Sequence, residues 1–217
     1  MEYWQRVEAF ENEFGVDFLR DVVHGLEVLY PETFDETAEL PSVYQRYLRP
    51  HLLRTKAEMA FLTAAQRHEL VAAAIENTSG DVHALIVGEP FVLTLSKIAH
   101  PRLSPRPARF RTLYSCYASF GQFPLEGDEF TLDHETVAIN DEAQPIYVLI
   151  GHGPDASYRE LGFVYANFVA PGGVGYLGPG MDLLERYATG TVGSIEEIGE
   201  PRVDLHDDGD EEDAQSG

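Results

Sequence analysis

The spacing of apolar residues changes along this chain, and that change is the strongest constraint on its fold. In the first part, apolar side chains recur every three or four residues, as from Tyr3 to Leu29, which is the period of one helix face. From about residue 121 the period becomes two, in short β-branched or aromatic runs separated by turn residues, which is typical of strands. The sequence therefore predicts an α+β fold, with a helical region at 1–120 and a small β region at 121–200.

The helical region is expected to contain several helices. Ser42–Gln45 has the pattern of a capping box and predicts a helix with Tyr44, Tyr47 and Leu48 on one face. A second such box at Thr63–Gln66 predicts a helix that continues to Ile75. The remaining expectations are a first helical run that ends at Pro31, short buried helices or alternatively strands at 81–87 and 91–99, and an amphipathic helix at 107–120 that includes Tyr114.

The β region is expected to pack with the helices as one domain. Its short connections favour antiparallel pairing, because a parallel pair needs a crossover of a dozen or more residues. The predicted strands are 130–132, 136–139, 146–150, 163–168 and 174–176, followed by a helix at Met181–Ala188. The segment 201–217 has seven acids, one Arg and few apolar residues, so a disordered acidic tail is expected there.

The chain is strongly acidic, with 37 Asp and Glu against 15 Lys and Arg, a net charge of −22. Such a surface repels phosphate, so nucleic acid is not an expected partner. Lys56 and Lys97 are the only lysines. A surface rich in carboxylates and poor in lysine suits a protein from a halophile, because concentrated salt screens the repulsion between carboxylates. The alternative is an ordinary acidic protein from a GC-rich genome, which explains the excess of Arg over Lys.

Several protein classes do not fit the composition. No apolar run approaches the roughly 20 residues that span a membrane, so no membrane association is expected and a cytoplasmic location is predicted. Cys116 is the single cysteine, which excludes an internal disulfide and a multi-cysteine zinc site. No cofactor or metal is predicted. Cys116 lies among aromatic residues and is interpreted as a core residue.

One basic stretch stands out against the acidic background. It contains four arginines, Arg102, Arg106, Arg109 and Arg111, with prolines between them. These arginines could bind a phosphate, a nucleic acid or an acidic partner. Alternatively, they form ion pairs with the chain's own surplus carboxylates.

A glycine-rich segment near the C-terminus matches the dinucleotide-binding pattern G-x-G-x-x-G at Gly173, Gly175 and Gly178. In that pattern the glycines let the backbone approach a pyrophosphate at a helix N-terminus. However, only 39 residues follow Gly178, too few for the rest of a dinucleotide-binding half. A glycine-rich turn between a strand and a helix is therefore the favoured interpretation.

His152 follows a strong strand pattern, at a place where an acid, base or metal ligand can be exposed. No second histidine occurs at ligand spacing, so a loop histidine is the alternative. The triplet Asp133–Glu135 contains three titratable groups but is interpreted as a solvated turn, because neighbouring side chains point in different directions.

Residues 147–187 resemble the C-terminal, GAF-like effector domain of the heat-inducible transcription repressor family (HrcA). The resemblance rests on Ile150-Gly151, Glu160-Leu161, Val164, Ala166–Phe168, Gly172–Gly175, Leu177–Pro179 and Met181-Asp182. The chain departs from the family's final motif by lacking its Arg and by having Leu183 in place of Tyr, and no winged-helix segment precedes it. The resemblance implies a relative of the sensing domain that does not bind DNA.

The sequence thus favours a non-enzymatic protein that binds a protein partner or a ligand, as a regulatory or sensory module, with self-association possible. Two alternatives remain. One is a structural component of a virion or other assembly, which would place the protein in a particle. The other is a small transferase or hydrolase that uses His152 and the glycine-rich turn.

Overall fold

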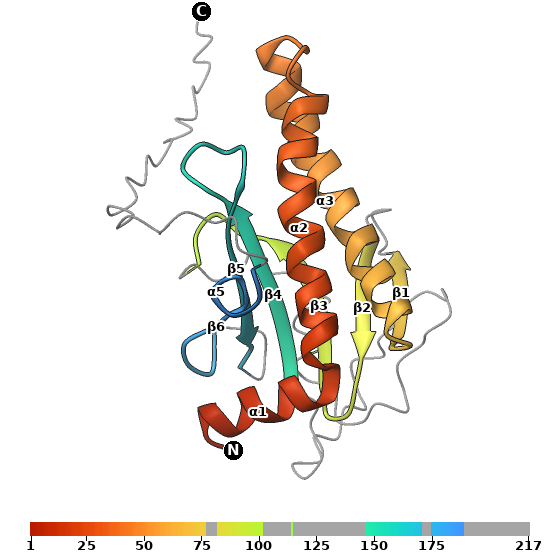
Figure 1. Ribbon diagram of the computed structural model, residues 1–217, viewed down its shortest axis with the longest axis vertical. Helices are drawn as coiled ribbons and strands as arrows, with labels where there is room; N and C mark the ends of the chain where they lie inside the picture. The colour runs from red at the N-terminus through yellow and green to blue at the C-terminus, as the bar shows by residue number, and fades with distance from the viewer. Residues whose placement is uncertain (77–81, 102–113, 115–145, 171–174, 189–217) are drawn as a thin grey trace, which may run out of the picture.

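Three helices form the first layer of the molecule. The computed structural model describes residues 1–76, 82–101, 114, 146–170 and 175–188. Helix α1 is Tyr3–Phe14, α2 is Val16–Glu36 and α3 is Ser42–Arg67. Gly15, at φ +77°, separates α1 from α2, and a left-handed conformation of this kind is readily adopted by glycine. α1 therefore turns away from the axis of the long α2–α3 hairpin (Figure 1).

The second layer is a six-stranded sheet in the order β1-β2-β3-β4-β5-β6. Its strands are β1 (Val71–Glu76), β2 (Val82–Val87), β3 (Phe91–Lys97), β4 (Ile146–Pro154), β5 (Leu161–Phe168) and β6 (Met181–Asp182). All neighbouring pairs are antiparallel except β3 and β4, which are parallel. The long segment between β3 and β4 supplies the crossover that a parallel pair requires.

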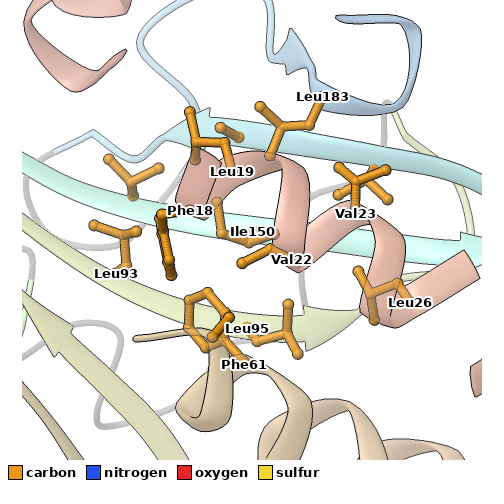
Figure 2. Close-up of a cluster of buried hydrophobic side chains, with 14 of the residues drawn as sticks. Phe18, Leu19, Val22, Val23, Leu26, Phe61, Leu93, Leu95, Ile150 and Leu183 are labelled. Atoms are coloured by element: carbon orange, nitrogen blue, oxygen red, sulfur yellow. The ribbon is translucent and has the colours of Figure 1, made fainter. Parts of the chain in front are cut away.

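The main core lies between the helices and one face of the sheet. α2 contributes a stripe with helical spacing that includes Phe18, Val22 and Leu26, and these pack toward Phe61 of α3 and Ile150 of β4 (Figure 2). This cluster contains residues from α1, α2 and α3 and from the five strands β2 to β6. The edge strand β1 contributes no buried residue to it. The helical layer and the sheet therefore share one continuous hydrophobic core.

The other face of the sheet carries a second, smaller buried cluster, which includes Val92, Tyr147 and Leu149. Tyr114 belongs to this cluster and is buried. Its hydroxyl shares a 3.0 Å hydrogen bond with Nε2 of His83, and its ring contacts Tyr147. The segment between β3 and β4 thus touches the second face of the sheet at Tyr114.

The predicted α+β class is confirmed, but the sheet is larger than expected and mixed. The helix predicted from Thr63 to Ile75 is wrong: Thr63 lies inside α3, and β1 begins at Val71. For 81–87 and 91–99 the strand alternative holds, as β2 and β3. These segments form strands because each lies between two other strands of the sheet. A local sequence pattern does not reveal such tertiary neighbours.

Two further expectations are corrected in part. α2 continues through Pro31 to Glu36, although proline lacks the N–H that an interior position uses. The predicted helix at Met181–Ala188 begins with the short strand β6 and continues as α5, Leu183–Tyr187, capped by the Asp182 side chain. The predicted helix at 107–120, apart from Tyr114, the predicted strands 130–132 and 136–139 and the tail 201–217 lie outside the described residues.

Candidate functional site

His152 lies inside β4, which continues to Pro154, so the expectation of a loop residue is wrong. It is buried, with 1% of its surface exposed. Its register neighbours are Lys97 of β3 and Val164 of β5. A Cβ added at the adjacent Gly153 would lie 2.3 Å from a ring carbon of Phe163, so close packing explains this glycine.

A tyrosine from the helical layer faces His152. The Tyr30 hydroxyl and His152 Nδ1 share a 2.9 Å hydrogen bond, and the two rings meet edge to face with centroids 5.9 Å apart. Tyr30 continues the buried stripe of α2 beyond Leu26. The pair therefore joins the C-terminal half of α2 to the central strand β4.

The electrostatics of this pair favour the neutral form of both groups. Burial, and in second place the charge of Lys97, lowers the pKa of His152 to about 3. Burial also lowers the pKa of Lys97 and raises that of Tyr30 above its usual value. A general acid or base works best with a pKa near the operating pH, so His152 is poorly suited to proton transfer near pH 7.

The described glycines of the predicted dinucleotide pattern lie in a turn after β5. Gly175 and Gly178 both have positive φ, +86° and +133°, and Ala170 donates its N–H to the Gly175 carbonyl at 3.1 Å. The β5 partner of His152 is Val164, four residues before the end of that strand at Phe168. At about 3.3 Å per residue, the turn lies at least about 13 Å along the sheet from His152. The structure therefore does not bring His152 and the glycines into one site.

The other candidate residues lie outside the described part of the chain. These are the arginine cluster Arg102, Arg106, Arg109 and Arg111, together with Gly173, Cys116 and the triplet 133–135. Among the described residues, no three His, Cys, Asp or Glu side chains are placed to hold a metal ion together. No described helix combines the length and apolarity needed to cross a membrane.

The most unusual surface is the projecting end of the α2–α3 hairpin, which extends past the strands (Figure 1). Along α3, the positions 57, 61 and 64 face the core, and Ala57, Phe61 and Ala64 are buried. The same three-and-four spacing continues backward through Arg54, Pro50 and Tyr47 to Val43. Tyr47 and Val43 are 73% and 74% exposed. The stripe that packs on the sheet thus continues past the sheet without a cover among the described residues.

The exposed end of the hairpin has a defined set of apolar side chains. We call them the hairpin patch: Val43, Tyr44, Tyr47 and Leu48. Tyr44 is 63% exposed, and the Tyr47 ring contacts His51 at a centroid distance of 5.2 Å. Tyrosine provides a large apolar area with few rotatable bonds and is enriched at protein interfaces.

Polar contacts hold the hairpin end in a fixed shape. Nε of Arg49 donates to Thr37 Oγ1 at 2.8 Å, and its Nη2 donates to Gln45 Oε1 at 2.9 Å. The same guanidinium lies 4.2 Å from the centroid of Phe34. These contacts tie α3 to the end of α2, so the hairpin patch is presented on a preorganised scaffold, which lowers the entropy lost on binding.

The helix that carries this patch is basic. α3 has five basic residues and the single acid Glu58, a charge of +4, whereas the remaining 10 basic and 36 acidic residues give −26. Glu58 is buried and accepts the backbone N–H of Ala84 at 2.7 Å. Of the basic residues of α3, Arg46 and Arg49 lie beside the hairpin patch, whereas the end of α2 and the turn that follows it carry the exposed acids Glu32, Asp35, Glu36 and Glu39.

Comparisons with models of known families, with curated proteins and with solved structures found no match to this chain. The sequence did place Tyr44, Tyr47 and Leu48 on one helix face, but it did not show that the sheet ends before this face. It did not indicate that Tyr30 pairs with His152. The position of Tyr30, four residues after Leu26 in the apolar stripe, does predict that its side chain is buried.

Proposed function

We propose that this protein is a non-enzymatic regulatory or sensory module that binds a protein partner through the hairpin patch. The observation that carries the proposal is the exposure of Tyr44 and Tyr47 on the end of a rigid hairpin. Exposed apolar residues that gather in one patch are typical of interaction sites, whereas single ones are common on any surface.

The chemistry of the patch indicates what the partner offers. Two tyrosines, a valine and a leucine fit an apolar groove, and Arg46 and Arg49 on the same helix can pair with carboxylates at one side of its rim.

The resemblance of residues 147–187 to the effector domain of the heat-inducible transcription repressors supports the same proposal, because it implies a sensing domain without DNA binding. We also propose a cytoplasmic location, and an origin in a halophile that rests on the excess of carboxylates and the scarcity of lysine. The buried, neutral His152 gives no support to the transferase or hydrolase alternative.

The test compares co-purification from the native cells in molar salt. We expect one partner protein to be enriched with the wild type and to be lost at least about tenfold with the double variant Tyr44→Ser/Tyr47→Ser. Trp4→Ser, which removes an exposed aromatic residue from α1, is the control and should retain the partner. Equal recovery with all three proteins overturns the proposal. Assembly of the purified protein into large particles also overturns it and favours the structural alternative.

A further inference from the structure

The two edges of the sheet differ in how they end. At one edge, β6 has two residues and runs directly into α5. At the other edge, β1 has six residues, and no strand among the described residues pairs with its outer side. An edge strand of this length can hydrogen-bond to another strand, and many proteins protect such edges with charges, prolines or bulges.

The register identifies the backbone groups on the outer side of β1. Ala74 is the register partner of Ala84, but Ala84 donates its N–H to Glu58 Oε2 rather than to β1. In an antiparallel pair, residues alternate between those that exchange both hydrogen bonds and those that direct both groups away. Ala72 and Ala74 therefore direct their N–H and C=O groups outward, away from β2.

Most of β1 lacks the charges that are frequent in the rest of the chain. From Val71 to Ile75 the strand contains only valine, alanine and isoleucine, and its one charged residue is the last, Glu76. α3 covers β1 on one face of the sheet, and its side away from α2 lies toward the β1 edge. Leu62 is on that side, about 200° around the helix from Ala60, which meets Gly25 of α2. Thr55 is seven residues earlier and shares this side.

The uncharged stretch Val71–Ile75 selects the partner for this edge. Two copies of a chain with a net charge of −22 repel each other over most of their surfaces. Contact between them is favoured where neither copy has a carboxylate in its sequence, as along Val71–Ile75 and at Thr55 and Leu62 of α3. Two antiparallel edges related by a two-fold axis are self-complementary, because each outward N–H finds an outward C=O.

We propose that a second copy of this chain pairs antiparallel with the outer edge of β1, so that one sheet continues across a two-fold axis. This surface is distinct from the hairpin patch and does not depend on the proposed partner. The backbone groups of Ala72 and Ala74 make the interchain hydrogen bonds. The two α3 helices then lie on the same face of the shared sheet.

The test measures the mass of the full chain by sedimentation at increasing protein concentration in molar salt. We expect the wild type to reach twice its 24.2 kDa mass. Ala74→Pro removes an outward N–H but no bond to β2, and proline is tolerated on an edge strand. It should raise the dimer dissociation constant at least about tenfold, equivalent to about 1.4 kcal/mol. Ala74→Thr retains the N–H and should still dimerise.

Hydrogen exchange of the wild type provides a second measurement that does not require the proline variant to fold. In the dimer, the amides of Ala72 and Ala74 should exchange more slowly as the protein concentration rises. A monomeric wild type at every concentration overturns the proposal, as does a dimer in which these two amides exchange at a constant, fast rate. The double variant Tyr44→Ser/Tyr47→Ser should dimerise normally, which separates this proposal from that for the hairpin patch.

Discussion

The Tyr30 hydroxyl on α2 and His152 Nδ1 on β4 share a 2.9 Å hydrogen bond across 122 residues of sequence. Both side chains are buried, so each polar group depends on the other in place of water. Lys97 of β3 is the register neighbour of His152 in the sheet.

Tyr30→Phe should destabilise the protein, because it leaves a buried ring nitrogen of His152 without its partner. An unsatisfied buried polar group typically costs about 1–3 kcal/mol. Urea denaturation followed by circular dichroism measures the change. Tyr44→Phe makes the same chemical change at an exposed residue and should alter the free energy of unfolding by less than about 0.5 kcal/mol. Equal effects of the two substitutions would contradict the role assigned to the buried pair.

The depressed pKa of His152 predicts a pH dependence of stability. In the unfolded chain a histidine titrates near 6.5, whereas in the folded protein burial lowers the pKa of His152 to about 3. Between pH 3 and pH 6.5 the His152 side chain binds a proton in the unfolded state but not in the folded state. The contribution of His152 to the free energy of unfolding is therefore complete above pH 6.5 and is lost as the pH falls toward 3.

The slope of this contribution approaches about 1.4 kcal/mol per pH unit. Carboxylates also titrate in this range, so the measurement compares wild type with His152→Asn from pH 7 to pH 4. The variant should be less stable at pH 7, and the difference should shrink as the pH falls. A difference that stays constant over this range would show that His152 is not held neutral in the fold.

The Glu58 side chain, and not a neighbouring strand, accepts a backbone hydrogen bond from β2. Its Oε2 accepts the N–H of Ala84 at 2.7 Å, one residue before the pairing of β2 with β3 begins at Leu85. Glu58→Ala should therefore lower the free energy of unfolding by about 1–3 kcal/mol. Glu58→Gln retains an acceptor oxygen and should lose less, as measured by thermal denaturation. A larger loss in the Gln variant would show that charge, not the hydrogen bond to Ala84, is what matters.

The sequence predicted the fold class and the three regions with helical spacing, because α1, α2 and α3 each bury a regular stripe. It failed where tertiary contacts decide. The run Val71–Glu76 is rich in alanine and carries little strand propensity, yet it pairs with β2. Thr63, whose spacing to Gln66 suggests a cap, donates its hydroxyl to the Met59 carbonyl within α3. Whether a residue caps a helix or lies inside it depends on where the helix begins.

The candidate site was predictable to a smaller extent, for a related reason. The strand pattern around His152 weakens at Gly151 and Gly153 and therefore suggests a loop, whereas the structure buries His152 inside β4. In the structure those glycines are required by the close approach of Ile98 and Phe163, two residues that lie outside β4. The hairpin patch has the spacing of a buried face, and only the length of the sheet relative to α3 shows that it is exposed.

Two glycines provide a matched test of packing. An added Cβ at Gly25 of α2 would meet the Ala60 Cβ at 3.5 Å, an ordinary contact, whereas at Gly153 it would lie 2.3 Å from Phe163 and 2.8 Å from the Ile98 carbonyl. Gly25→Ala should stabilise the protein by about 0.5–1 kcal/mol, since alanine favours the helix. Gly153→Ala should destabilise it by about 1–3 kcal/mol because of overpacking. Melting temperatures that move in the same direction would contradict the packing described for β4.

The acidic surface predicts that salt stabilises the protein. The Debye length falls from about 10 Å at 0.1 M to about 3 Å at 1 M salt, so repulsion between carboxylates weakens. We expect the melting temperature to rise by about 5 °C or more between 0.1 and 1 M potassium chloride, a change of about 1–2 kcal/mol for a chain of this size. The triple variant Glu8→Gln/Glu32→Gln/Glu39→Gln removes three exposed carboxylates and should show a smaller rise. A melting temperature that is constant or falls with salt would mean that the charge does not reflect adaptation to high salt.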